Sequence, residues 1–335
     1  MILIITNKGD IHCNPVIKHL QKNGDDYFRL NTESLLTDYQ VSFSYKNESV
    51  NLLIQNKING KSLSSNEVIS VWERRPNTPI LPKIKSEKIK SVVEDEASEL
   101  AKWIRHFFIN CRMIGSSVWD RPNESKLRQM NTASIVINEL KSKIKLPHTL
   151  LTNSKKDLEH FSESNPELVV KPISADGLML DDKFEIPFTS RKVSHKNLNI
   201  ITQEDLDLCP TFIQEYIEKN YELRITVIGK KILCCKINSQ KLPKGNGRED
   251  WREGYEHGLA EVEEWVDCPI EIESFIFSYM QKMQLNFGCF DFINAKNDYY
   301  YFLECNPNGQ WMWLEEDLGI PISEAIANFL SFREN

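Results

Sequence analysis

Glu304 and Asn306 are two oxygen-bearing side chains at the end of an otherwise apolar segment near the C-terminus. Residues 299–311 read YYYFLECNPNGQW, so the chain reaches Pro307 directly after them. Side chains at positions i and i+2 of an extended strand point to the same face, so the two oxygens are expected to converge. Hard divalent cations such as magnesium bind carboxylate and amide oxygens and keep positions open for phosphate and water. The strand end is therefore a candidate metal site.

A third oxygen ligand is predicted on the strand that precedes this one. Asn297 and Asp298 are typical of a two-residue hairpin turn, and such a turn places Asp291 directly opposite Glu304. Two facing carboxylates repel each other in an ordinary sheet, so we expect a positive charge between them. The alternative interpretation is a polar strand end that faces water.

Cationic and acidic side chains also occur in two other predicted strands. Lys171 follows the apolar run in ELVVKPIS, and YELRITVIG places Glu222 and Arg224 on one strand face. The phosphates of a nucleoside triphosphate need such cations, its magnesium ions need oxygen ligands, and its ribose hydroxyls suit a carboxylate acceptor. The set indicates a nucleotide site, although Glu222 and Arg224 alone could form a surface ion pair of little energetic value.

A fourth segment, FIQEYIE, is an apolar strand interrupted by polar residues. If this strand connects two lobes, its main-chain donors and acceptors are available to hydrogen-bond with adenine. The segment is therefore predicted to contact the nucleobase, through Gln214, Glu215, Tyr216 and Ile217.

The elements that must position these residues alternate between strands and helices. The start of the chain predicts a βαβ order, with a strand in MILIIT, a helix that ends at Gly24, and a strand in DYFRLNTE. A hairpin over 39–60 is expected to be added to this sheet. Helical spacing of apolar residues predicts a long helix over 86–108 and a second one after Pro122.

The later segments continue this mixed pattern, so the fold class is predicted to be α/β with α+β lobes. Composition and turn signals divide the chain into three units, which are expected to span 1–117, 118–212 and 213–335.

Composition limits the classes of partner. The 335 residues are 41% hydrophobic and 27% charged, as in an ordinary soluble protein, and the net charge of −7 argues against a general nucleic-acid binder. Apolar runs are too short for a signal peptide or a membrane span, so no membrane partner is expected. The eight cysteines contain no C-x-x-C pair, so buried thiols are favoured over zinc ligands. Free thiols are typical of a reducing compartment, so a cytoplasmic location is expected.

The ordered set VVKP, QEYI, ELRITVIG, DF and ECNPNGQW resembles the ATP-grasp superfamily, in which a nucleotide lies between a central and a C-terminal lobe. The phrases MILIITNKGD, FRLNTE, VWERRP and DWR are similar to the maturases of microviridin-type (graspetide) peptides, and closest to the grasp-with-spasm branch. The resemblance implies an ATP-grasp fold with an N-terminal pre-ATP-grasp domain at 1–117, a central lobe at 118–212 and a C-terminal lobe at 213–335.

The resemblance also implies a reaction. These maturases use ATP to phosphorylate an Asp or Glu side chain of a ribosomal precursor peptide, and a Ser or Thr hydroxyl or a Lys amine then forms an ester or amide. The partner implied is a peptide with a leader and a core rich in Thr, Ser, Glu and Asp. Two alternatives stay open: a ligase that joins an amino acid to a peptide or small carboxylate, and a non-catalytic ATP-binding regulator.

Site roles follow from the resemblance, position by position. Lys171 and Lys126 would contact the phosphates, the latter on a weaker match, and Arg224 would lie at the transferred phosphoryl group. Main-chain groups of Glu215 and Ile217 would bind adenine, and a carboxylate would hold the ribose. By the same resemblance, Glu222 would supply this carboxylate. The protein ligands of two magnesium ions would be Asp291, Glu304 and Asn306.

Two arginines are weaker candidates for the substrate. Arg252 in DWR could bind a phosphate or a substrate carboxylate, since the guanidinium fork binds such groups with two parallel hydrogen bonds. Arg74 in VWERRP could contact substrate, but a structural salt bridge is the stronger alternative. The glycine-rich phosphate lid of many relatives is thin here, with Gly177 in SADG alone, and a homodimer is implied only by the family.

Overall fold

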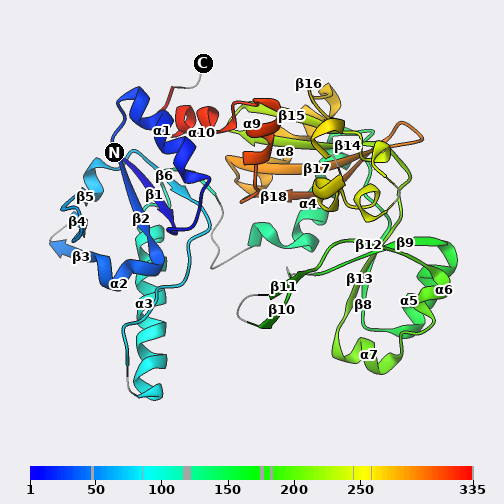
Figure 1. The fold of residues 1–335 in the computed structure, drawn as a ribbon, viewed down its shortest axis with the longest axis horizontal. Helices are drawn as coiled ribbons and strands as arrows, with labels where there is room; N and C mark the ends of the chain where they lie inside the picture. The colour runs from blue at the N-terminus through cyan, green and yellow to red at the C-terminus, as the bar shows by residue number, and fades with distance from the viewer. Residues whose placement is uncertain are drawn as a thin grey trace.

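The structure is a computed structural model that describes residues 1–46, 49–84, 86–115, 122–173, 177–181, 184–243, 245–257 and 259–333. Its strands form separate sheets that correspond to an N-terminal region, a central lobe and a C-terminal lobe (Figure 1). The predicted border at 117 lies outside the described residues.

The N-terminal region contains the predicted βαβ arrangement. A parallel sheet in the order β2-β1-β6-β7 is built from β1 (Ile2–Thr6), β2 (Tyr27–Asn31), β6 (Ser70–Glu73) and β7 (Arg112–Ile114). Between its first two strands, α1 (Cys13–Asn23) ends at Gly24, whose φ of 73° is readily adopted only by glycine. The short α2 (Leu35–Asp38) and the long α3 (Glu87–Phe107) complete the region.

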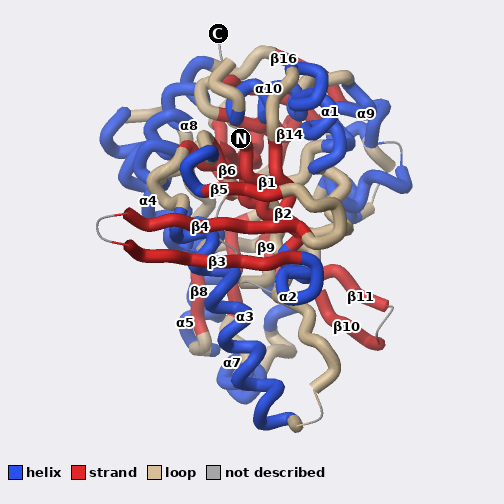
Figure 2. The backbone as a smooth tube through the Cα atoms, turned by 90° about the vertical axis from the view of Figure 1, so that its left-hand side faces the viewer, coloured by secondary structure: helices blue, strands red, loops and turns tan. Residues whose placement is uncertain are grey.

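The predicted hairpin does not join this parallel sheet, so that part of the prediction is wrong. It forms a separate three-stranded antiparallel sheet from β3 (Tyr39–Lys46), β4 (Ser49–Asn56) and β5 (Ser62–Ser64). The hairpin buries alternate residues such as Leu52 and Ile54 against α3, which lies beneath β3 and β4 in Figure 2. Packing on a helix satisfies this apolar face, so no sheet extension is needed.

The central lobe is an antiparallel sheet covered by short helices. Its order is β12-β9-β13-β8, formed by β8 (Thr149–Thr152), β9 (Glu167–Lys171), β12 (Arg191–Ser194) and β13 (Thr211–Glu215). The helices α5 (Lys155–Ser164), α6 (His195–Leu198) and α7 (Gln203–Leu208) enclose a small core of their own around Leu158 and Ile213. A separate hairpin of β10 (Gly177–Asp181) and β11 (Phe184–Pro187) precedes β12.

The C-terminal lobe is a five-stranded antiparallel sheet in the order β16-β15-β14-β17-β18. Its strands are β14 (Lys219–Ile228), β15 (Lys231–Ile237), β16 (Glu263–Val266), β17 (Phe287–Ala295) and β18 (Tyr300–Asn306). One face packs against α8 (Ile270–Met283) and also against α4 (Lys126–Leu140). Although α4 falls within 118–212, its buried Ala133 and Val136 therefore belong to the C-terminal core.

The opposite face of this sheet shares its core with the N-terminal region. One apolar cluster joins Ile2, Ile4 and Val16 to buried residues of β15 and β17 and to the last two helices, α9 (Met312–Leu318) and α10 (Ile322–Leu330). Figure 1 shows α1 beside α10, near both chain ends. The N-terminal region and the C-terminal lobe are thus joined by a continuous core, whereas the central lobe has a separate one.

The edge of the C-terminal sheet at β18 is partly covered. Lys145 lies beside Tyr301 in an isolated parallel bridge, in which the Lys145 amide donates to the Tyr300 carbonyl at 2.8 Å and the Phe302 amide donates to the Lys145 carbonyl at 3.0 Å. Gln129 of α4 makes two further bonds to the backbone of Cys305. The strand that carries Glu304 is therefore fixed on its outer side.

Candidate active site

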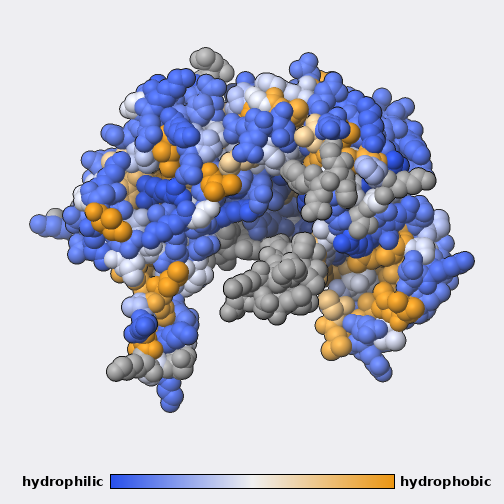
Figure 3. Space-filling view, viewed as in Figure 1, coloured by the Kyte–Doolittle hydropathy of each residue, from blue (hydrophilic) through white to orange (hydrophobic). Residues whose placement is uncertain are grey.

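A cavity of about 630 Å³ lies between the central and C-terminal lobes. Its walls come from β9, β13, β14, β17 and β18, from the connecting residues 215–217, and from the segment 249–252. This volume counts all the empty space between the walls, including the part that is open to solvent. Figure 3 shows this side of the molecule as mainly hydrophilic and hollowed between α3 and the central lobe.

The hairpin that carries the predicted metal ligands has the expected pairing at the site, but not at its turn. Asp291 lies opposite Glu304, as predicted. The turn is wrong: the Ala295 amide bonds to the Tyr299 carbonyl around a three-residue loop, in which Asp298 has a φ of 63°. An extra residue in β18, Leu303, forms a bulge that restores the register.

The bulge has a direct consequence for the cavity. In a regular strand, consecutive side chains point to opposite faces, whereas Leu303 and Glu304 both line the cavity wall. Cys305 then points into the core and is 1% exposed, so the predicted alternation from Glu304 onward is confirmed. The bulge therefore gives the wall an apolar surface beside a carboxylate.

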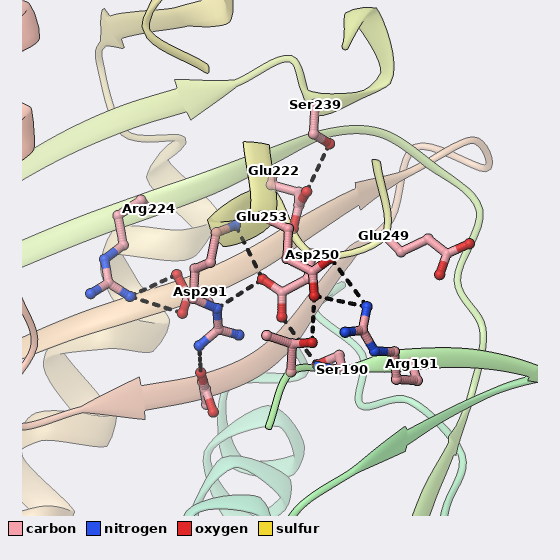
Figure 4. Close-up of polar contacts among 12 residues, drawn as sticks. Ser190, Arg191, Glu222, Arg224, Ser239, Glu249, Asp250, Glu253 and Asp291 are labelled. Carbon is pink, nitrogen blue, oxygen red and sulfur yellow. Dashed lines mark hydrogen bonds and ion pairs between the residues drawn. The ribbon is translucent and has the colours of Figure 1, made fainter. Parts of the chain in front are cut away.

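Arg224 and Asp291 form a buried ion pair at the base of this wall (Figure 4). Nη1 of Arg224 donates to both carboxylate oxygens, at 3.0 and 2.9 Å, and the two side chains are each 7% exposed. The guanidinium carbon of Arg224 lies 5.8 Å from the ring centre of Trp251. The alternative of a surface pair between Glu222 and Arg224 is wrong, because both residues are buried and Arg224 pairs with Asp291.

Glu304 forms ion pairs with two cations at once. Its carboxylate lies 3.4 Å from Nζ of Lys126 and 3.5 Å from Nη1 of Arg252. Burial opposes its ionisation, but Arg252, Lys126 and Lys171 together lower the pKa of Glu304 to about 2. Burial raises the pKa of Asp291, and the Glu304 charge adds to this effect although Arg224 opposes it. The site therefore holds at least one firmly ionised carboxylate.

Lys171 ends β9 and lines the cavity from the central lobe. Burial lowers the pKa of Lys171 to about 8, and the Glu304 carboxylate limits the shift. The ammonium group therefore stays mostly charged at neutral pH, as a contact to phosphate requires.

Glu222 also lines the cavity, where it is held by two donors. Nζ of Lys219 and Oγ of Ser239 both donate to its Oε1 at 2.8 Å. Lys219 is itself fixed by the carbonyl of Glu249 at 3.0 Å. The carboxylate is thus fixed in place at the cavity wall (Figure 4).

The QEYI segment forms the connection between the two lobes. The side chain of Gln214 donates to Thr149 at 3.0 Å, and the amides of Glu215 and Tyr216 bond to carbonyls of the central lobe at 2.9 and 3.0 Å. Among the described residues, no backbone partner of the Ile217 amide is found. All four residues of the segment line the cavity, so the Ile217 amide is available to a ligand there.

Sequence reasoning missed an acidic segment that joins the lobes across the cavity mouth. Asp250, 4% exposed, accepts bonds from the backbone and Nε of Arg252 at 3.2 and 2.8 Å. Glu253 pairs with Arg191 at 2.8 Å, and the Ser190 amide lies 3.4 Å from Asp250 (Figure 4). The acidic spacing in GREDWREG could have indicated this, but the sequence does not reveal which strand the acids meet.

Four predicted site residues lie outside the described cavity lining, namely Lys126, Arg224, Asn306 and Arg74. Asn306 is on the same strand face as Glu304, two residue pairs farther along, and its Oδ1 accepts the Asn308 amide at 2.9 Å. Arg74 is 1% exposed at the junction with the N-terminal region, 3.1 Å from Asp10. Because its guanidinium is enclosed, a substrate contact by Arg74 is ruled out in this structure, and the structural alternative holds.

Carboxylate and amide oxygens are both ligands that a hard cation accepts, so Asp291, Glu304 and Asn306 fit such an ion. Within the part of the chain that the structure describes, no cluster of three His, Cys, Asp or Glu side chains could hold a metal ion. The candidate set is two carboxylates and one amide, which is typical of magnesium shared with phosphates and water. The surrounding cations in turn suit phosphate oxygens.

Comparison with known families decides the class of the chain. A profile described as a RimK-like ATP-grasp domain matches residues 131–330, more than half of the sequence. The chain belongs to the ATP-grasp family. A second profile, described as the MvdD pre-ATP grasp domain, matches residues 1–112 of this ATP-grasp protein. The predicted fold class and the resemblance to ATP-grasp enzymes are therefore confirmed.

Solved structures similar to this ATP-grasp protein include peptide-modifying ligases. A RiPP-associated ATP-grasp ligase of Chryseobacterium gregarium, in complex with ADP and a leader and core peptide, is 25% identical, with a TM-score of 0.86 over 100% of this chain and 97% of that one. The macrocyclase MdnC of Microcystis aeruginosa MRC, bound with precursor peptide MdnA, is 27% identical, with a TM-score of 0.80 over 100% of both chains.

The macrocyclase MdnB of the same Microcystis strain is 26% identical, with a TM-score of 0.75 over 99% of both chains. A search of curated proteins finds no match.

No described helix of this ATP-grasp protein combines the length and apolar character that a membrane crossing requires. The grasp-with-spasm branch and the thin lid stay predictions, and Ser174, Ala175 and Asp176 of SADG lie outside the described residues.

Proposed function

We propose that this ATP-grasp protein is an ADP-forming ligase that closes side-chain rings in a ribosomally made precursor peptide. The observation that carries the proposal is the cavity between the lobes, in which Asp291 and Glu304 face each other amid Lys171, Arg224 and Arg252. Such a charge pattern suits phosphoryl transfer, which depends on positioning and charge neutralisation. The similarity to solved ligases with bound precursor peptides supports a peptide as the substrate.

The nucleotide is proposed to lie along the cavity from the connecting strand to the hairpin. Adenine would bond to the carbonyl of Glu215 and the amide of Ile217, with Gln214 and Tyr216 shaping the pocket, and the ribose would bond to Glu222. Lys171 from β9 and Lys126 at the start of α4 would then hold the phosphates, because both lie near Glu304.

Magnesium is proposed to bind where the carboxylates meet, with Asp291, Glu304 and Asn306 as the protein ligands of two ions. The bound metal would neutralise phosphate charge during transfer. Arg224, Arg252 and Lys126 form ion pairs with the two carboxylates. Phosphate oxygens would give these three cations new partners and free the carboxylates for the metal.

The reaction has two balanced steps. An Asp or Glu carboxylate of the peptide attacks the γ-phosphorus of ATP, which forms an acyl phosphate and releases ADP. A Ser or Thr hydroxyl, or a Lys amine, then attacks the acyl carbon, so that phosphate leaves, a proton is released, and an ester or amide remains. Arg224 would stabilise the transferred phosphoryl group, and Arg252, which is half exposed at the cavity mouth, would hold the incoming carboxylate.

The peptide partner is proposed to carry a leader and a core rich in Thr, Ser, Glu and Asp. A cytoplasmic location and a homodimer also stay predictions. Light scattering of the purified protein with and without peptide would measure the number of chains in the particle.

The decisive experiment is mass spectrometry of a cognate precursor after incubation with protein, ATP and Mg²⁺. We expect products lighter by one water per ring, and their loss in Asp291→Asn and Glu304→Gln, which preserve side-chain size. Glu316→Gln, an exposed carboxylate on α9, is the matched control and should retain activity. Thermal unfolding of each variant separates lost chemistry from lost folding.

Two other outcomes would contradict the proposal. A product heavier by one amino acid would indicate an intermolecular ligase. Binding of ATP with no ADP formed in the presence of the verified peptide would indicate a non-catalytic regulator.

A further inference from the structure

Arg74 is a buried arginine that links the N-terminal region to the turn after β18. Its Nη1 donates to the carbonyl of Asn308 and, at 3.1 Å, to the carbonyl of Gly309. On the other side, Asp10 lies 3.1 Å from Nε and the ring of Trp311 lies 4.8 Å from the guanidinium carbon. Nη1 and the ion pair with Asp10 thus hold the guanidinium in a residue that is 1% exposed, whereas Nη2 has no hydrogen-bond partner among the described residues.

The turn that Arg74 holds begins at Asn306. The Gly309 amide bonds to the Asn306 carbonyl at 3.3 Å, and the Asn308 amide donates to Oδ1 of Asn306 at 2.9 Å. The orientation of the Asn306 side chain is thus set by the position of residue 308. Since Arg74 bonds to the carbonyl of the same residue, it acts on Asn306 through one intervening residue.

Side chains of β14 and of the segment before α4 hold the same turn. Nη2 of Arg224 donates to the Gln310 carbonyl at 3.3 Å, and the side chain of Asn308 donates to Glu124, just before α4, at 3.2 Å. Space is also restricted, because a Cβ atom added at Gly309 would lie 2.5 Å from Sγ of Cys289. The turn is therefore tightly enclosed by its neighbours.

The backbone next to Arg74 is itself unusual. Arg75 has a φ of 45°, a left-handed conformation that costs a non-glycine residue free energy, and its carbonyl is held by Asn7 at 2.7 Å. Such strain persists only where surrounding contacts fix it.

We propose that Arg74 is a positioning residue, by which the N-terminal region fixes the turn 306–309 and orients Asn306 toward the bound metal and nucleotide. The inference rests on the proposed function, because it assumes that Asn306 is a metal ligand. Groups that orient metal ligands typically change metal affinity by about 10- to 100-fold when they are removed. The N-terminal region would then contribute to the nucleotide site without touching the nucleotide.

The test measures ADP affinity by calorimetry with and without Mg²⁺ in wild type, Arg74→Met, Arg74→Lys and Gly309→Ala. We expect the enhancement of ADP affinity by Mg²⁺ to fall about 10- to 100-fold in Arg74→Met, with ADP affinity in the absence of Mg²⁺ nearly unchanged. Arg74→Lys should give a smaller loss, because lysine keeps the charge but not the guanidinium fork. Gly309→Ala should resemble Arg74→Met, since it displaces the same turn.

Arg112→Met is the matched control. Arg112 also joins the N-terminal sheet to the C-terminal helices, with its guanidinium 3.7 Å from the ring of Phe329, but it lies away from the turn. This variant should lower the unfolding temperature and leave the magnesium enhancement intact.

Two results would overturn the inference, and they differ in meaning. If wild type shows a magnesium enhancement and the folded Arg74 and Gly309 variants retain it, Arg74 is merely structural and the proposed function stands. If wild type itself shows no magnesium enhancement, the metal site and the positioning role fail together.

Discussion

At the scale of single residues, Asp291 and Glu304 face each other at the cavity wall but have different electrostatic environments. Asp291 forms a buried ion pair with Arg224. Glu304 instead lies close to Lys126 of α4 and to Arg252 of the segment 249–253. Removing one member of a buried pair leaves an uncompensated charge and typically costs about 3–5 kcal/mol. Asparagine and glutamine remove the same charge as alanine but preserve side-chain size, so they avoid an added cavity and are the more informative replacements here.

Lys171 provides a pH-dependent prediction. Its pKa is lowered to about 8, so the free protein loses this positive charge as the pH rises through 8. A phosphate ligand favours the charged form, and binding above pH 8 must therefore include proton uptake. We expect ADP affinity to fall between pH 8 and 9.5, approaching about tenfold per pH unit, as one proton per site requires.

Calorimetric titrations from pH 7 to 9.5 would measure this fall. Lys171→Arg should be flat over the same range, because arginine stays protonated. Lys196→Arg, at an exposed lysine of the same lobe, should behave as wild type. An equally flat wild-type profile would contradict the assignment of Lys171 to the phosphates.

At the scale of elements, the edge strand β16 carries a half-buried acid, Glu263, whose carboxylate oxygens are enclosed. Among the described residues, neither carboxylate oxygen of Glu263 has a hydrogen-bond donor. Burial raises the pKa of Glu263 to about 7, and the charge of Asp317 adds to the effect. The folded state therefore retains a proton that the unfolded chain loses near its ordinary pKa of 4.5.

Because of Glu263, the free energy of unfolding should fall as the pH rises from about 4.5 to 7. Above pH 7 this group should change the stability little further. Glu263→Gln should remove that contribution, so the variant gains on wild type by roughly 1–2 kcal/mol at pH 8, after allowance for partial exposure. Urea unfolding at pH 5 and pH 8 measures it. A gain of equal size at both pH values would mean that packing, not ionisation, is responsible.

The hairpin β17–β18 illustrates how much of the fold and site could be predicted from sequence. Alternating apolar residues and turn signals identified both strands and the facing carboxylates correctly. They could not reveal that a longer turn and a bulge at Leu303 compensate each other, because a bulge depends on twist and packing. Likewise, nothing local in VWERRP indicates that Arg74 meets a backbone turn at residues 308 and 309.

At the scale of the whole molecule, the chain has two mechanical parts. One core joins the N-terminal region to the C-terminal sheet, and the central lobe encloses its own smaller core. Polar contacts such as the Arg191–Glu253 pair connect the lobes at the cavity mouth, and exposed ion pairs of this kind contribute about 1 kcal/mol or less. Motion of the central lobe is therefore the least costly way to admit a nucleotide.

Paired core substitutions test this division. Ile326→Ala in α10 and Leu206→Ala in α7 each remove a fully buried side chain, at an expected cost of about 2–5 kcal/mol. Hydrogen exchange should show that Ile326→Ala lowers protection in β1 and β15 but not in β9. Leu206→Ala should lower protection in β9 and leave β1 unchanged.

If both substitutions weaken protection uniformly across the chain, the two cores unfold as one unit. A loss confined to α10 in the first variant would instead show that the N-terminal region is independent of the C-terminal lobe.

The bridge between Lys145 and β18 also affects behaviour in concentrated solution. A bare edge strand offers unpaired amides and carbonyls on which another chain can form a sheet, a common route to aggregation. Here Lys145 takes up part of that edge, and Gln129 takes up more of it at Cys305. The same contacts that hold the β17–β18 hairpin rigid therefore make it a poor template for amyloid-like pairing between neighbouring molecules.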